Sequence, residues 1–404
     1  MKSWISGWYT GLASKLKVTL VFFFIAAVLG LSMRLMHTGW ISIHFKNILH
    51  THSHIALLGW LYNVALIVLQ YVIFRKTKSK INLAFWLSQI TFLGMMFSFP
   101  FQGYAAISIT FSTLYLFCTY YLVYTLFKET KNGENRNVAQ LIRWSGVYLI
   151  FSSIGPYALG FIMAKGLADT YWYKLAIYWF LHFLYNGFFL LVVFAFVFEQ
   201  LKDLKQSKRI FQWMNFSIIP SFALSVLWLE PHILIYLIAF IAAMLQLLAF
   251  GLLAKQNKVI QLWNIPWAKA VFILSVAAYT LKVIFQVLAV HPEIQTFLME
   301  TVSYSVIGFI HLVMLGFFTL FFLAVLIEKQ WLEMTVFNQV GLSLLTIGII
   351  GSEILLFGQS IAVYFEVFQI AQYFKMLMGI SALMPIGIGL MMVEVLRNKI
   401  TEYR

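Results

Sequence analysis

Apolar residues along the chain run in long blocks, and polar residues are confined to the short breaks between them. Twelve blocks are each close to the roughly 20 residues that an α-helix needs to cross the hydrocarbon core of a bilayer. They cover residues 18–36, 47–74, 81–102, 104–127, 144–164, 175–198, 210–229, 233–254, 268–290, 303–327, 340–360 and 376–396. Because backbone polar groups in lipid must be satisfied within the segment itself, we predict twelve transmembrane helices.

The composition excludes most soluble classes of protein. Of 404 residues, 62% are hydrophobic and 10% are charged, whereas an average soluble domain has about 25% charged residues. Such a chain cannot cover a surface that faces water, so soluble enzymes, nucleic-acid binders and disordered scaffolds are excluded. Cys118 is the single cysteine, which rules out disulfides and thiolate metal clusters.

The net charge of +14 is explained by the predicted membrane topology, because the basic residues are concentrated on one side of the membrane. Most Lys and Arg residues lie at the two termini and in the loops after the second, fourth, sixth and eighth blocks. Basic loops stay in the cytoplasm, so we expect both termini there and no nucleic-acid partner. We expect an interfacial segment at 1–17, a single membrane domain at 18–397 and a cytoplasmic tail at 398–404.

A histidine pattern recurs at nearly equal intervals. Histidine, four residues, glycine and an aromatic residue follow one another at three places, 128 and 129 residues apart: His54 to Trp60, His182 to Phe188 and His311 to Phe317. Each histidine lies on the second helix of a four-helix stretch. The fold class we predict is therefore an all-α membrane protein with twelve helices, both ends inside, built from three pseudo-repeats at about 18–127, 144–254 and 268–397.

A histidine at membrane depth is either a hydrogen-bonded packing residue or a ligand. Recurrence at equal spacing, depth and helix position favours a ligand. Neutral imidazole is a common ligand of haem iron, copper and non-haem iron, so the pattern predicts a bound cofactor.

Twelve helices with histidines on the second, sixth and tenth resemble the haem–copper oxidase subunit I superfamily, which includes the nitric oxide reductase large subunit and has NnrS-like proteins as more distant relatives. The string HSHIALLGW resembles the family's second helix, which carries a low-spin haem ligand. HFLYNGF resembles the sixth, which carries a metal ligand, and HLVMLGF resembles the tenth, which carries haem ligands.

The resemblance implies a b-type haem held by His54 and His311. Arg34, near the outer end of the first block, either pairs with a haem propionate or extends its charged group to the membrane interface. The resemblance also implies a second metal, copper or non-haem iron, at His182. The remaining candidates are His232 as a partner of His182, His50 and His52 as neighbours of the haem ligand or as a surface metal site, and Tyr185 as a catalytic residue.

Departures from the family pattern argue against a complete oxygen-reducing centre. The adjacent histidine pair near the seventh helix is missing, Phe309 stands where the tenth helix has an earlier histidine, and Tyr185 follows His182 by three residues instead of four. We therefore expect a haem-binding redox protein of the bacterial plasma membrane that transfers electrons or handles or senses O2 or NO. A quinol or cytochrome donor and partner subunits are implied. The sequence leaves open whether the protein is an enzyme. If it is one, it is an oxidoreductase of the haem–copper oxidase type.

Two alternatives remain from the sequence: a secondary transporter with twelve helices, and an oxidase-like assembly or scaffold protein without catalysis. Two further charges lie within apolar blocks, Lys282 in the ninth and Glu353 in the eleventh, at matching depth. A structural ion pair is one interpretation of these two residues, and a proton relay is the other.

Overall fold

The computed structural model describes residues 11–75, 79–131, 135–201, 204–367 and 370–397. Within these ranges all regular structure is helical and no strand is present. Twelve helices are long and apolar enough to cross a membrane, so the chain is an all-α membrane protein with twelve helices, as predicted.

Seven spans are single helices: α2 (Leu12–His37), α5 (Ser79–Gln102), α6 (Ala106–Glu129), α12 (Ile233–Ala254), α13 (Pro266–Leu288), α17 (Val336–Tyr364) and α18 (Tyr373–Arg397). The fifth span consists of α7 (Arg136–Ser152) and α8 (Ile154–Ala164), and the seventh of α11 (Ser207–Ile218) and the 3₁₀ helix η4 (Pro220–Leu229). A short 3₁₀ helix, η5 (Asn257–Leu262), and the helix α14 (Pro292–Glu300) lie between spans.

The other three spans each contain π-helical turns. The second span is α3 (Phe45–His54), η1 (Ile55–Tyr62), α4 (Asn63–Val68) and η2 (Leu69–Ile73). The sixth is α9 (Tyr171–His182), η3 (Phe183–Phe189) and α10 (Leu190–Gln200), and the tenth is α15 (Val302–His311), η6 (Leu312–Thr319) and α16 (Leu320–Glu328).

These same three spans are the core helices. In their most apolar stretch at least 83% of the residues are buried, against at most 50% in the other nine spans. A helix that is apolar all round and surrounded by protein is the expected centre of a bundle. The predicted histidines therefore lie on the three most buried spans.

The first span differs from the prediction at its start. Helix α2 begins at Leu12, six residues before the apolar block predicted from residue 18, and its first turns are buried. The Lys15 side chain has no exposed surface. Its ammonium group donates hydrogen bonds to Gln70 Oε1 at 3.0 Å, to the Tyr71 hydroxyl at 3.2 Å and to Asn82 Oδ1. Lys15 is thus part of the buried helix, whereas the sequence indicated an interfacial segment.

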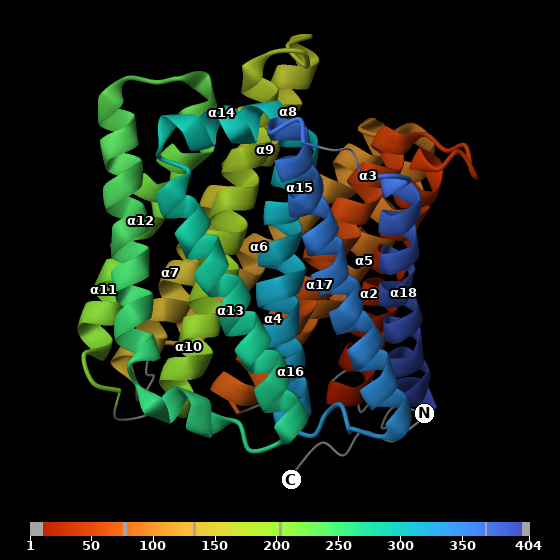
Figure 1. Cartoon of the computed structure of the whole chain (residues 1–404). Helices are drawn as coiled ribbons and strands as arrows, with labels where there is room; N and C mark the ends of the chain where they lie inside the picture. The colour runs from red at the N-terminus through yellow and green to blue at the C-terminus, as the bar shows by residue number, and fades with distance from the viewer. Residues whose placement is uncertain (1–10, 76–78, 132–134, 202–203, 368–369, 398–404) are drawn as a thin grey trace. The chain divides into compact units, whose positions relative to one another are not determined.

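The chain forms two compact units. Unit 1 comprises residues 1–115, 263–279 and 300–404, and unit 2 comprises residues 116–262 and 280–299. In unit 1, α2, α17 and α18 pack side by side (Figure 1). Lys17 Nζ donates to the Leu396 carbonyl at 3.0 Å, so the start of α2 lies beside the end of α18. In unit 2, α11 packs against α12 (Figure 1).

Candidate functional site

Each histidine of the repeated pattern occupies the same local structure. His54, His182 and His311 are each the last residue of an α-helical segment, and a π-helical segment begins at the next residue. π-Helical turns are rare and are often found at functional sites. The likeness that the sequence shows in three short strings thus extends to the backbone.

The glycine of each pattern lies in the π-helical segment and packs against the preceding span. A Cβ atom added at Gly59 would lie 2.9 Å from Phe22 Cβ on α2. At Gly187 it would lie 2.4 Å from Tyr148 Cβ on α7, and at Gly316 it would lie 3.1 Å from Ala278 Cβ on α13. The three glycines therefore allow the close approach of a neighbouring helix.

His182 uses both ring nitrogens in hydrogen bonds. Its side chain is 1% exposed. The Nε2 atom lies 2.8 Å from the carbonyl oxygen of Ile218, and Nδ1 lies 3.3 Å from Asn186 Nδ2. Pro220 follows the end of α11 at Ile218, and the Phe222 N–H bonds to Ile219 instead of Ile218. The Ser221 hydroxyl also donates to this carbonyl, at 3.0 Å. His182 and Ser221 thus share a carbonyl that the broken helix leaves without its usual backbone partner.

His232 and Tyr185, the other predicted residues of unit 2, have contacts of their own. The side chain of His232 accepts a hydrogen bond from the Leu234 N–H at 3.3 Å and caps α12. The ring of Tyr185 lies 6.3 Å from that of His182, centroid to centroid. Among the residues that the structure describes, no group of three or more His, Cys, Asp or Glu side chains could hold a metal ion.

Lys282 and Glu353, the two charges within apolar blocks, lie in different units, and each is described with the neighbours of its own unit. Lys282 Nζ, in unit 2, donates to Gln246 Oε1 at 2.9 Å, and Gln246 Nε2 donates to the Ser221 hydroxyl at 3.1 Å. Glu353, in unit 1, lies within electrostatic range of Arg34.

In unit 1, His50 and His54 share one face of α3, as their spacing of four predicts. The His54 ring stacks on Phe99 at 4.6 Å, and the His50 ring lies 4.5 Å from Tyr104. His54 Nδ1 lies 2.8 Å from the His50 carbonyl oxygen. A hydrogen bond of this kind fixes the tautomer and leaves Nε2 as the nitrogen able to act as a ligand.

His52 points to the opposite neighbour, helix α2. Its Nδ1 lies 2.8 Å from the Ala26 carbonyl oxygen. Its ring packs over Gly30, where Cε1 is 3.1 Å from the position a Cβ would take. This places His52 within electrostatic range of Arg34, one turn further along α2. Its Nε2, like that of His54, is left as the candidate ligand atom.

Arg34 is the centre of a polar cluster in unit 1. In the topology predicted from the sequence, this cluster lies near the outer side of the membrane. Four side chains from four other helices lie within electrostatic range of its guanidinium: His52, His311, Glu353 and Tyr373. Within the described ranges, neither Arg34 nor His311 makes a side-chain hydrogen bond. His311 is also within electrostatic range of His52. His52 and His311 thus both lie within electrostatic range of Arg34, and the choice of His54 as the partner of His311 stays a prediction.

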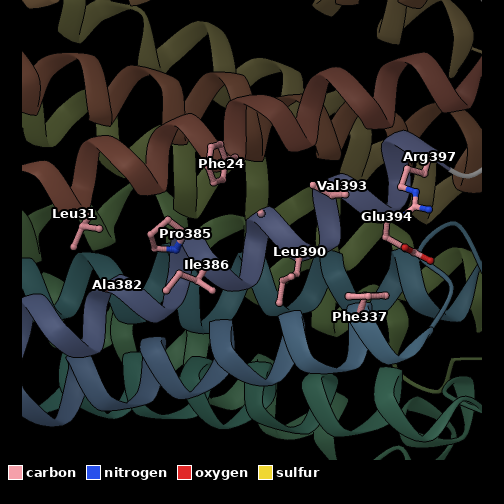
Figure 2. Close-up of a pocket in the computed structure, with 11 residues that line it drawn as sticks. Phe24, Leu31, Phe337, Ala382, Pro385, Ile386, Leu390, Val393, Glu394 and Arg397 are labelled. Atoms are coloured by element: carbon pink, nitrogen blue, oxygen red, sulfur yellow. The ribbon is translucent and has the colours of Figure 1, made fainter.

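A groove of about 530 Å³ lies elsewhere on unit 1, along α2, α17 and α18 (Figure 2). Leu31 lies at one end of it, and the charged Glu394 and Arg397 lie at the other (Figure 2). No predicted site residue lines this groove. The Arg34 cluster, in the interior of unit 1, is therefore the better candidate for the functional site.

Comparison with known proteins adds no constraint. The chain matches no family model and no curated protein.

Proposed function

We propose that the chain is a haem-binding redox protein of a bacterial plasma membrane, which transfers electrons or handles or senses a small gas such as O2 or NO. The observation that carries the proposal is the Arg34 cluster. A guanidinium and a histidine without hydrogen-bond partners among the described residues lie within range of a second histidine whose Nε2 is unused.

These residues fit a haem in two respects. Two imidazole nitrogens, one from α3 and one from α15, would hold the haem iron. A guanidinium without a hydrogen-bond partner among the described residues suits a carboxylate, because Arg binds planar carboxylates through two parallel hydrogen bonds. When bound between two imidazoles, haem supplies one-electron transfer.

The role of each residue follows from its contacts. His311 would be one ligand. Among the described residues its ring makes no hydrogen bond that would have to break first. His52 is the preferred second ligand because its ring lies on the Arg34 side of α3 and its Nδ1 is held by Ala26. His54, the ligand implied by the family resemblance, is the alternative. A quinol or a cytochrome is the proposed electron donor.

Visible spectra of the purified protein, oxidised and then reduced with dithionite, test the proposal. We expect a Soret band and sharp α and β bands on reduction, lost in His311→Ala and in His52→Ala. His54→Ala is the matched substitution on the same helix and should retain them. His232→Ala, which removes a helix cap in unit 2, controls for general destabilisation. A colourless wild-type protein from cells supplied with haem would refute the proposal.

A transporter is the second candidate, and the seventh span favours it. Its helix is broken at Pro220 beside the buried polar groups of Ser221, Gln246 and Lys282. Discontinuous helices next to buried polar groups form the substrate sites of many transporters. Stable wild-type protein that binds no haem would make this the leading function, to be tested by uptake into proteoliposomes.

A further inference from the structure

One face of helix α18 carries small side chains that line the groove along α2, α17 and α18 (Figure 2). Ala382, Pro385 and Gly389 are three and four residues apart, so they lie on the same side of the helix. Phe24 of α2 packs over Gly389, where a Cβ atom would lie 3.3 Å from Phe24 Cε2. The groove volume of about 530 Å³ is within the range of ligand-binding cavities, about 300–1,000 Å³. The small side chains of α18 therefore leave room for a ligand.

The groove is apolar over a length that matches one leaflet of a bilayer. Its lining along α18 is apolar from Ala382 as far as Glu394. These two residues are twelve positions apart, about 18 Å along a helix, and half of the hydrocarbon core of a bilayer is about 15 Å. Ile386 and Val393 are 53% and 50% exposed, so the groove is accessible from the surface. An extended acyl chain fits such a groove in length and in polarity.

The charged end of the groove carries an acid and a base together. Glu394 and Arg397 are three residues apart on the last turns of α18, and both line the groove (Figure 2). Side chains at this spacing are neighbours, with Cβ atoms about 5–6 Å apart. In the topology predicted from the sequence, this end lies at the cytoplasmic surface of the membrane. The groove thus presents one negative and one positive group at the depth of a phospholipid headgroup.

A third charge at this end is directed to the backbone. Lys17 Nζ donates to the Leu396 carbonyl at 3.0 Å. The carbonyl groups at the C-terminus of a helix carry a partial negative charge, which a cation compensates. Glu394 and Arg397 are therefore the charges that line the groove itself. A zwitterionic headgroup, with a phosphate and an ammonium group, is complementary to this pair. An anionic headgroup is repelled by Glu394 and offers it no positive group.

We propose that the groove binds one molecule of an ethanolamine phospholipid from the cytoplasmic leaflet. An acyl chain lies along α18 in the direction of Leu31. Arg397 donates to the lipid phosphate, because a guanidinium suits the geometry of phosphate oxygens, and the Glu394 carboxylate accepts from the lipid ammonium group. The groove belongs to unit 1 and no histidine lines it, so the proposal does not depend on haem binding.

Native mass spectrometry of the full chain tests the proposal. The protein is freed of lipid in detergent and titrated with phosphatidylethanolamine or phosphatidylglycerol that carry the same acyl chains. We expect one phosphatidylethanolamine to bind about tenfold more tightly, the effect of about one charge-assisted hydrogen bond. Glu394→Gln should abolish this preference. Arg397→Gln should weaken the binding of both lipids, because both carry a phosphate, and Ala382→Trp should prevent binding by filling the apolar part of the groove.

A second apolar groove provides a matched control. It has a volume of about 520 Å³, lies along α5 and α6, and among the described residues no charged side chain lines it. Leu93→Trp fills this groove as Ala382→Trp fills the first one. The Leu93→Trp variant should keep the wild-type preference for phosphatidylethanolamine.

Four results would overturn the proposal. The first is a wild type with no preference between the two lipids, and the second is a wild type that prefers phosphatidylglycerol. The third is a preference that survives in Glu394→Gln, or binding that survives in Ala382→Trp. The fourth is a second copy of the chain, or another protein, in place of the lipid, seen as a higher mass that Ala382→Trp removes. If Ala382→Trp does not fold, Glu394→Gln and Arg397→Gln decide, because they change side chains at the end of α18 that are only partly buried or exposed.

Discussion

The three repeated glycines give a graded prediction for alanine substitution. At each glycine the methyl group adds two opposed effects. Alanine favours a helix over glycine by about 1 kcal/mol. The added carbon also enters the contact with the preceding span, and overpacking of this kind costs about 1–3 kcal/mol.

The contact distances decide which effect wins. At Gly187 the new carbon would lie 2.4 Å from Tyr148 Cβ, an atom tied to the backbone, so helix α7 must move. The cost is then near the upper end of that range, and Gly187→Ala should lose about 2 kcal/mol net. Gly59→Ala, at 2.9 Å from Phe22 Cβ, should lose about 1 kcal/mol. Gly316→Ala, at 3.1 Å from Ala278 Cβ, should be close to neutral.

Thermal unfolding of the purified protein in detergent, followed by tryptophan fluorescence, measures this order. Gly251→Ala on α12 and Gly379→Ala on α18 are matched controls, because a Cβ at either position meets nothing within 4 Å. Both should raise the melting temperature slightly. If Gly187→Ala melts with the controls, or if Gly316→Ala is the least stable of the three, the packing argument is wrong.

Three further predictions concern buried hydrogen bonds and one surface amine. Trp60→Phe removes the 2.9 Å bond from Trp60 Nε1 to the Thr319 hydroxyl and should cost about 1–3 kcal/mol in thermal melts, whereas Thr319→Val added to that variant should cost much less. Lys282→Met leaves Gln246 Oε1 without its 2.9 Å donor and should cost about the same; a second change, Gln246→Leu, should recover stability, and a further loss would contradict the reasoning. Burial lowers the pKa of Lys329 below its ordinary value of 10.5, so folding favours the neutral amine. The free energy of unfolding should therefore increase as the pH rises from the lowered pKa to the ordinary value, and the added stability should be absent below that interval. Melts of Lys329→Met across the same alkaline range should lack that rise.

The spans could be predicted from the sequence because the bilayer imposes a simple length rule. All twelve predicted blocks correspond to observed spans. Helix α2 was predicted to start too late because Lys15 and Lys17 were interpreted as cytoplasmic charges. The amides that accept from Lys15 lie on other helices, 55 and 67 residues away in sequence. Hydropathy carries no information about such partners.

The candidate site was only partly predictable. The repeated pattern identified three histidines that share a local structure, but it could not show that His182 would be used to satisfy Ile218. The preference for His54 over His52 came from the pattern repeated in three helices and from the family resemblance, and neither carries information about the neighbours of a side chain. A signal for His52 was present in α2, where Gly30 and Arg34 are four residues apart and share a face. A small residue and a cation on one face together mark where another polar side chain can approach.

The division into two units has a consequence for biosynthesis. Unit 2 needs no residue beyond position 299, whereas unit 1 needs both the first and the last third of the chain. Membrane helices enter the bilayer in the order in which they are made, so unit 2 can be complete while the ribosome is still translating unit 1. Arg34 and His52 are then inserted in the membrane before α15 and α17, which carry His311 and Glu353, have been synthesised. A nascent chain stopped before residue 300 should therefore retain a folded unit 2 and an unassembled Arg34 site.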